Sequence, residues 1–140
     1  MTTQPFKITI ANAEIRHAKI FNPKRIHTFN HCHVDVCKIQ CISPISDGSY
    51  DITLVSGWEL KRIDDRYTQR SVIEQHWRAL LPNRIYNACE WLIDLHRVQC
   101  IGPFDSEEYA VTLVSGWELK LLNSQHKFID IYSAWEALTV

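Results

Sequence analysis

Glycine is scarce in this chain, and long apolar runs are missing. Only four of the 140 residues are glycine, and no glycine-rich loop that could cradle a phosphate is present. No apolar run approaches the roughly 20 residues that span a bilayer. The polar start at residues 1–5 also lacks the apolar stretch of a signal peptide. We therefore expect a cytoplasmic protein without a membrane partner.

An excess of charge of either sign is also lacking. Fifteen Lys and Arg residues against 16 Asp and Glu residues give a net charge of −1, and 46% of the chain is hydrophobic. This composition is typical of a soluble globular protein. It argues against broad electrostatic binding of nucleic acid, although a local basic patch remains compatible with it. The five cysteines are an odd number, which favours reduced thiols over a disulfide framework.

The main feature that the chain does contain is an internal repeat. The string T-L-V-S-G-W-E-L-K occurs at residues 53–61 and again 59 residues later, at 112–120. Flanking residues match at the same offset, which indicates a duplicated supersecondary unit. A Trp-x-Ala-Leu sequence in each copy matches one residue out of phase, so the second copy has lost a residue. We predict a single domain, 1–140, with internal repeats at 23–81 (unit one) and 82–140 (unit two) and an N-terminal strand segment at 6–22.

The repeated string predicts a β-hairpin. A three-residue loop at 55–57 would place its glycine in the left-handed region that such loops require at their last position. This register pairs Thr53 with Glu59 and Asp51 with Lys61, and it separates apolar from polar side chains on the two faces of the hairpin.

Several residues of the two copies are predicted to fill the core. Trp58 and Trp117 lie on the apolar face of their hairpins, so we expect both to be buried. Exposed tryptophans that stack on a ligand are the alternative. Cys41 and Cys100 occupy equivalent positions between apolar neighbours, and we expect each to be a small buried residue.

Each unit combines strands with one helix. Alternating apolar residues predict short strands before the hairpin, and apolar residues at helical spacing predict helices at about 68–81 and 124–138. A capping box from Ser71 to Glu74 supports the start of the first helix. No Gly-, Ser- or Pro-rich linker separates the units. The predicted fold class is α+β and β-rich, with two pseudo-symmetric strand-strand-hairpin-helix units that share one core about a pseudo-two-fold axis.

Histidine and cysteine gather in one segment of unit one. If residues 31–37 form a single strand, alternate side chains project from one face, and all of these residue types ligate zinc. The spacing matches no usual zinc signature, so we expect a solvated strand face without any cofactor, and zinc binding is the alternative. The candidate metal ligands are His31, His33, Asp35 and Cys37.

Patterns typical of catalysis are missing. The Val-Ser-Gly turns lack the first glycine of a nucleophile elbow, so we predict a protein that is not an enzyme. The hairpin register does not explain why the glutamate and lysine of the string are identical in both copies. These residues are therefore candidates for binding a protein partner, in an adaptor or inhibitor with duplicated surfaces or in a homodimer. They are Glu59, Lys61, Glu118 and Lys120.

Basic residues form local groups despite the balanced total charge. Lys24 and Arg25 open unit one, and Arg62 and Arg66 follow its hairpin. Such groups can contact phosphates.

The order of motifs resembles the LytTR type of DNA-binding domain over residues 31–122. The matching motifs are V-D-V-x-x-I, T-L-x-x-G, L-L-P, an Arg-Ile pair at Arg84, W-L-I-D-L-x-x-V and V-T-L-x-x-G. The resemblance implies a mostly β fold in which the segment after the helix and the end of the last strand contact DNA. Arg84 fits the framework, but residues 87–90 and Leu121-Leu122 replace the polar and basic residues expected at those contacts.

The sequence therefore predicts a non-enzymatic binding protein with DNA as the first partner. The residues proposed to contact DNA are Lys24, Arg25, Arg62, Arg66 and Arg84. A protein-binding adaptor or inhibitor is the alternative, and a metal-binding protein is the third possibility.

Overall fold

The computed structural model describes residues 21–103, 105 and 107–139. Within these residues, ten strands and two α-helices confirm the β-rich α+β class. The strand segment predicted at 6–22 lies, apart from its last two residues, outside the described residues.

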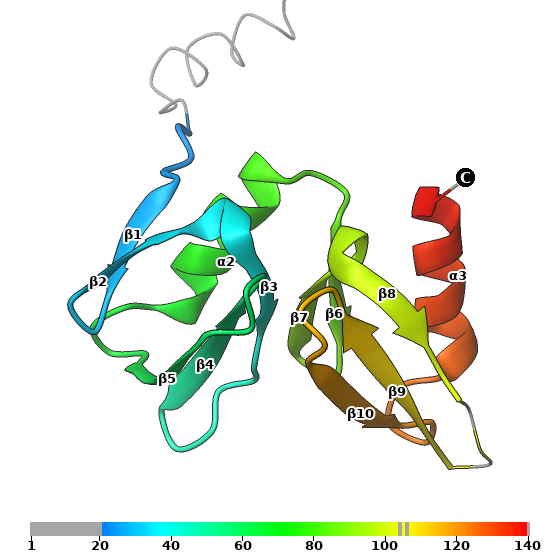
Figure 1. The fold of residues 1–140 in the computed structure, drawn as a ribbon. Coiled ribbons are helices and arrows are strands. Elements are labelled where there is room, and N and C mark those ends of the chain that lie inside the picture. Colours follow the sequence, from blue (N-terminus) through cyan, green and yellow to red (C-terminus); the bar gives the residue numbers. More distant parts are fainter. Residues whose placement is uncertain (1–20, 104, 106, 140) are drawn as a thin grey trace, which may run out of the picture.

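The two units contain the same elements in the same order (Figure 1). Unit one comprises β1 (Ile26–Phe29), β2 (Cys32–Asp35), the 3-10 turn η1 (Val36–Lys38), β3 (Ile39–Ile42), β4 (Ser49–Leu54), β5 (Glu59–Asp64) and α2 (Arg70–Leu80). Unit two comprises β6 (Ile85–Ala88), β7 (Trp91–Asp94), the 3-10 turn η2 (Leu95–Arg97), β8 (Val98–Ile101), β9 (Glu108–Leu113), β10 (Glu118–Leu122) and α3 (Phe128–Thr139).

The predicted hairpin register is confirmed next to the turn and wrong beyond it. Thr53 pairs with Glu59 as expected, and Gly57 has the left-handed φ of 93° that the loop requires. The register then shifts, because a β-bulge follows in β5. Its extra residue is Arg62, whose φ is 57° and whose N–H donates to Asp51 Oδ1 at 2.9 Å. Asp51 therefore faces two residues of β5, Lys61 and Arg62, instead of Lys61 only.

The bulge locates the residue that unit two has lost. The β9–β10 hairpin runs without a register shift, and Leu121 rather than Leu122 is buried at the position that Ile63 has in unit one. Equivalent residues are 59 apart before the bulge and 58 apart after it. A pair of equivalent hydrogen bonds shows both spacings. Tyr50 donates its hydroxyl hydrogen to the Thr68 carbonyl at 2.6 Å, and Tyr109, 59 residues later, donates to the carbonyl of His126, 58 residues after Thr68, at 2.8 Å.

The two helices begin through the same side-chain contact. The backbone N–H of Arg70 donates to Asp65 Oδ1 at 2.8 Å, and that of Phe128 donates to Asn123 Oδ1 at 2.8 Å. The predicted capping box is wrong, because α2 already begins at Arg70 and Ser71 is its second residue. A carboxylate or amide five residues upstream satisfies the first amide instead.

The described strands form three sheets. The β1–β2 hairpin stands alone, β8, β9 and β10 form a second sheet, and the third has the order β5-β4-β3-β7-β6. In Figure 1, β6 and β7 of unit two lie between the sheet strands of unit one and the sheet of β8 to β10. Unit two therefore lends its first hairpin to the sheet of unit one.

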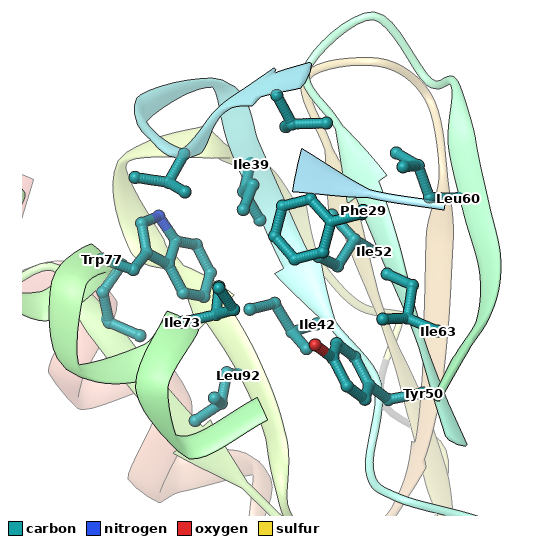
Figure 2. Packing of buried hydrophobic residues seen from close by; sticks show 13 residues of the cluster. Phe29, Ile39, Ile42, Tyr50, Ile52, Leu60, Ile63, Ile73, Trp77 and Leu92 are labelled. Atoms are coloured by element: carbon teal, nitrogen blue, oxygen red, sulfur yellow. The ribbon is translucent and has the colours of Figure 1, made fainter. Parts of the chain in front are cut away.

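Buried residues form two clusters rather than one shared core. The first surrounds α2, where Ile73 and Trp77 face Phe29 and Ile52 (Figure 2). The second lies between α3 and the sheet of β8 to β10. The clusters interlock, since the first contains Ile85 and Leu92 of unit two and the second contains Cys41 of unit one.

Two expectations about buried residues are wrong. Trp58 is 54% exposed, and Trp117 is only half-buried. Unit two packs Trp117 against Trp91, with ring centroids 5.9 Å apart, whereas unit one has Cys32 at the equivalent of Trp91. Trp58 therefore lacks the aromatic neighbour that partly covers its counterpart.

Candidate nucleic-acid interface

A groove lies in unit one between the start of β1 and the turn that precedes α2. Its volume is 440 Å³, and we call it the unit-one groove. Tyr67 is 80% exposed beside it, and the Arg66 guanidinium carbon lies 5.3 Å from the centroid of the Tyr67 ring. The lining residues are His27, Thr28, Arg66, Tyr67, Thr68, Gln69, Val72 and Ile73.

Four of the five arginines and lysines predicted to contact DNA are exposed in unit one. Lys24 and Arg25 immediately precede β1, Arg62 is the bulge residue of β5, and Arg66 lines the groove. The β1–β2 turn approaches β5, because Asn30 Nδ2 donates to the Lys61 carbonyl at 3.3 Å. The two basic groups are thus carried by neighbouring parts of one unit.

Carboxylates accompany two of these cations. Arg25 Nε lies 2.8 Å from Asp35 Oδ1, and Arg66 Nη2 lies 2.8 Å from Asp64 Oδ2. The Arg66 guanidinium holds the pKa of Asp64 below its ordinary value, so this carboxylate remains ionised. In the described part of the chain, no ion pair engages Lys24 or Arg62, which leaves those two charges open to an incoming phosphate.

His27 gives the groove a titratable group. Its Nε2 lies 2.9 Å from the Lys24 carbonyl oxygen, and its ring centroid lies 4.7 Å from that of His76. Burial lowers the pKa of His27 below its usual value of 6.5, and the charges of the neighbouring His76 and Lys24 act in the same direction, whereas the hydrogen bond to the Lys24 carbonyl opposes this shift. The imidazole is therefore neutral at pH 7 and gains a positive charge only at lower pH.

Arg84 has a different position from the other four. Its Nε and Nη2 atoms contact the two carboxylate oxygens of Asp94 at 3.0 and 2.5 Å, and Asp94 is fully buried. A guanidinium held in this bidentate contact fixes the start of β6 against the end of β7. We therefore assign Arg84 a role in the fold and leave it out of the unit-one surface.

The structure does not assemble the predicted metal ligands. The chain turns at both ends of β2, so His31 lies in a turn with φ of 67° and Cys37 lies in η1. His33 Nδ1 lies within hydrogen-bond distance of Thr28 Oγ1, at 3.0 Å, and Asp35 Oδ1 accepts a hydrogen bond from Arg25 Nε. Among the residues that the structure describes, no three His, Cys, Asp or Glu side chains are grouped to hold a metal. The prediction that these four residues share one strand face is wrong.

The residues proposed for protein binding lie on edge strands. Lys61 Nζ is 3.7 Å from Glu59 Oε1 on β5. Glu118 and Lys120 on β10 line a hollow of 260 Å³ with Gly102, Pro103, Asp105, Glu108, Tyr109 and Ala110. The two copies of the string thus present the same residues in different surroundings.

Sequence reasoning missed Tyr67 and its neighbours Thr68 and Gln69. The signal was present in an aromatic residue next to Arg66 in a polar stretch before a helix. The sequence alone did not show that this stretch lies next to His27 and Thr28, where the two segments together line the unit-one groove.

Comparisons with known proteins identify one similar fold. No protein-family model matches the chain, and no curated protein matches it. The structure is similar, with a TM-score of 0.53, to the LytTr DNA-binding domain of a protein from Bacillus cereus described as a methyl-accepting/DNA response regulator. The similarity covers 77% of this chain and 95% of that chain at 11% sequence identity.

The resemblance that the sequence motifs indicated is therefore confirmed at the level of the fold. At 11% identity the likeness concerns the arrangement of elements. Neither of the two helices in the described residues is long and apolar enough to cross a membrane. The chain has the fold of a LytTr DNA-binding domain.

Proposed function

We propose that this protein binds duplex DNA through the basic surface of unit one. The observation that carries the proposal is the similarity to a LytTr DNA-binding domain, which includes 95% of that domain. Catalysis is not part of the proposal, because binding through such a fold requires none.

The distribution of cations favours unit one as the contact surface. Unit two has Ser124 and Gln125 at the equivalents of Arg66 and Tyr67, and it has lost the bulge residue that is Arg62 in unit one. Arginines provide the charge that binds phosphates, and an exposed tyrosine beside them offers a ring that stacks on a sugar or base.

The first prediction concerns Arg62 and Arg66, which have no arginine at the equivalent positions of unit two. The double variant Arg62→Ala/Arg66→Ala should bind duplex DNA about tenfold or more weakly near 0.1 M salt, because two phosphate contacts are lost. The slope of log affinity against log salt concentration should become shallower by about 2. Fluorescence anisotropy with random-sequence duplexes across a salt series measures both quantities.

A control removes the same charge from unit two. The variant Lys120→Ala/Lys127→Ala loses two exposed lysines outside the unit-one surface, so it should retain the affinity and the salt slope of the parent. Equal losses in both double variants would indicate a response to net charge alone and would contradict the proposed surface. Absence of binding by the parent at low salt would overturn the proposed function itself.

The second prediction concerns pH. Because the folded pKa of His27 lies below 6.5, lowering the pH through that pKa adds a positive charge to the groove, and DNA affinity should rise between pH 7.5 and 5.5. The same shift makes the free protein less stable in that range, because the unfolded chain takes up the proton more readily. His27→Gln should lose the rise in affinity.

His31→Gln is the matched control, because His31 is exposed in the β1–β2 turn and does not line the groove. It should keep the pH response of the parent. If the response survives in His27→Gln, another group is responsible for it.

A further inference from the structure

One strand pairing joins the two units, and the equivalent pairing between the corresponding strands of the repeat, both of which the structure describes, is not formed. Strand β7 pairs antiparallel with β3, with Cys41 opposite Ile93 and Ile42 opposite Leu92. In the repeat, β8 is the equivalent of β3, and β2 is the equivalent of β7. A two-fold relation between the units would therefore also pair β8 with β2. Among the described strands, however, β8 pairs only with β9 and β2 only with β1. The predicted pseudo-two-fold arrangement is wrong, and the units are joined head to tail.

The free edge of β8 shows what the missing contact leaves exposed. Gln40 and Cys41 of β3 are buried, whereas their equivalents on β8, Gln99 and Cys100, are exposed. This exposure corrects the prediction that Cys100 is buried. The orientation of the backbone agrees with a vacant edge, since the Gly102 N–H donates inward to the Ala110 carbonyl at 2.8 Å. Successive amides of a strand point to opposite sides, so the Ile101 N–H points outward.

Side chains around the two free edges show the same contrast. Ile85 of β6 is 8% exposed in the first cluster, whereas its equivalent on β1, Ile26, is 47% exposed. Trp77 of α2 is fully buried in that cluster, whereas its equivalent on α3, Trp135, is half-buried. Unit one thus exposes Ile26, the equivalent of the residue that anchors the hairpin of unit two in the first cluster. Unit two exposes part of Trp135, the equivalent of the residue against which that hairpin packs.

We propose that copies of this chain associate head to tail, with β2 of one copy adding to the β8 edge of another. The internal β3–β7 contact sets the register, in which Val34 of one copy faces Cys100 of the next and His33 faces Ile101. The proposal commits to a second copy because the chain itself carries both halves of the contact, on opposite units. Such an interface is heterologous, so it forms rings or open chains rather than a two-fold dimer.

One substitution between the units sets the strength of this association. The equivalent of the buried Leu92 is His33, which is exposed and polar. The intermolecular contact therefore buries less apolar surface than the internal one. In addition, two separate copies lose translational freedom on binding, which the internal contact does not require. We expect reversible assembly that depends on concentration.

The test is the mass of the full chain in solution as a function of concentration. Sedimentation velocity or light scattering should give the monomer mass of 16.4 kDa at low concentration and rising masses at high concentration. Ile101→Pro removes an outward amide from the β8 edge, and His33→Pro does the same on β2, where proline is tolerated because the amide faces away from the partner strand. Each variant should remain monomeric.

Mixing the two proline variants makes the test specific. Ile101→Pro keeps an intact β2, and His33→Pro keeps an intact β8, so the mixture should form a species of twice the monomer mass and nothing larger. Leu122→Pro is the matched control, because β10 is the other edge of the same sheet and the Leu122 amide also points outward from it, while the next amide, Asn123 N–H, donates inward to the Glu107 carbonyl. It should associate like the parent.

Three outcomes would overturn the proposal. They are a parent chain that stays at the monomer mass at its highest soluble concentration, association that Leu122→Pro weakens as much as Ile101→Pro, and mixed variants that do not recover a dimer although both are folded. Circular dichroism establishes folding. If Ile101→Pro does not fold, Ile101→Lys takes its place, because a charge on an exposed edge also disfavours strand addition.

A second measurement follows the same edge without any substitution. Alkylation of Cys100 by a thiol reagent, located by peptide mass spectrometry, should slow as the protein concentration rises. Alkylation of Cys89, which lies in the turn between β6 and β7, should keep its rate. Equal rates at Cys100 across a concentration range in which the mass increases would place the contact elsewhere and contradict the proposal.

Discussion

Replacing Asp94 by alanine should lower the free energy of unfolding by about 3–5 kcal/mol. The Asp94 carboxylate is fully buried, holds Arg84 in a bidentate contact and lies 3.5 Å from Arg97 Nε. It also accepts the His96 N–H at 3.0 Å at the start of η2. Removing it leaves guanidinium groups without their counter-charge next to the second core cluster, and that unpaired charge dominates the loss. Urea unfolding followed by tryptophan fluorescence measures the difference.

Unit one supplies the matched control for this substitution. Asp35 is the equivalent of Asp94, pairs with Arg25, the equivalent of Arg84, and accepts the Cys37 N–H at 2.9 Å. The chemistry is the same, but the Arg25 side chain is 57% exposed and water screens the pair. Asp35→Ala should therefore cost about 1 kcal/mol. Similar losses at both positions would show that burial does not set the strength of this contact.

The parts of the fold that the sequence predicted are those determined by local residues. The repeated string has only one register that separates its polar and apolar side chains, and Gly57 suits only the last position of the loop. The structure accordingly confirms the pairing of Thr53 with Glu59. The helices likewise follow from apolar spacing, within two to four residues at their starts.

The errors arise where a residue's surroundings come from a distant part of the chain. Trp58 and Cys100 have the same immediate neighbours as Trp117 and Cys41, so the repeat predicted the same burial for each pair. Whether a strand edge is covered depends on β7, which lies in the other unit and adds to only one of the two equivalent edges. The lost residue was detectable from the sequence, but its place in a bulge at Arg62 was not.

The candidate site divides in the same way. Charge grouping identified Lys24, Arg25, Arg62 and Arg66, and all four are exposed on unit one. The fifth residue, Arg84, came from the resemblance to LytTR domains rather than from charge grouping, and that resemblance did not reveal that Asp94, ten residues away on β7, holds it. The groove itself depends on the approach of β1 to residues 66–69, which no local pattern encodes.

The burial of Trp77 under a hairpin of the other unit leads to the second large effect. Trp77→Ala should lower the free energy of unfolding by about 3–5 kcal/mol, because it removes the largest fully buried side chain and leaves a cavity in the first cluster. The Trp77 indole N–H is buried without a hydrogen-bond partner in the described residues, so Trp77→Phe sacrifices no hydrogen bond and should cost less.

Trp135→Ala provides the comparison, since Trp135 is the equivalent residue on α3 and is half-buried. It should cost about 1–2 kcal/mol in the monomer, because less apolar surface returns to water than at Trp77. Thermal or urea unfolding at low protein concentration tests the pair of variants. Leu92 and Ile85 of unit two belong to the cluster around Trp77, and no equivalent hairpin covers Trp135. A loss at Trp135 as large as that at Trp77 would therefore contradict the view that the hairpin of unit two, rather than the helix sequence, makes the first core.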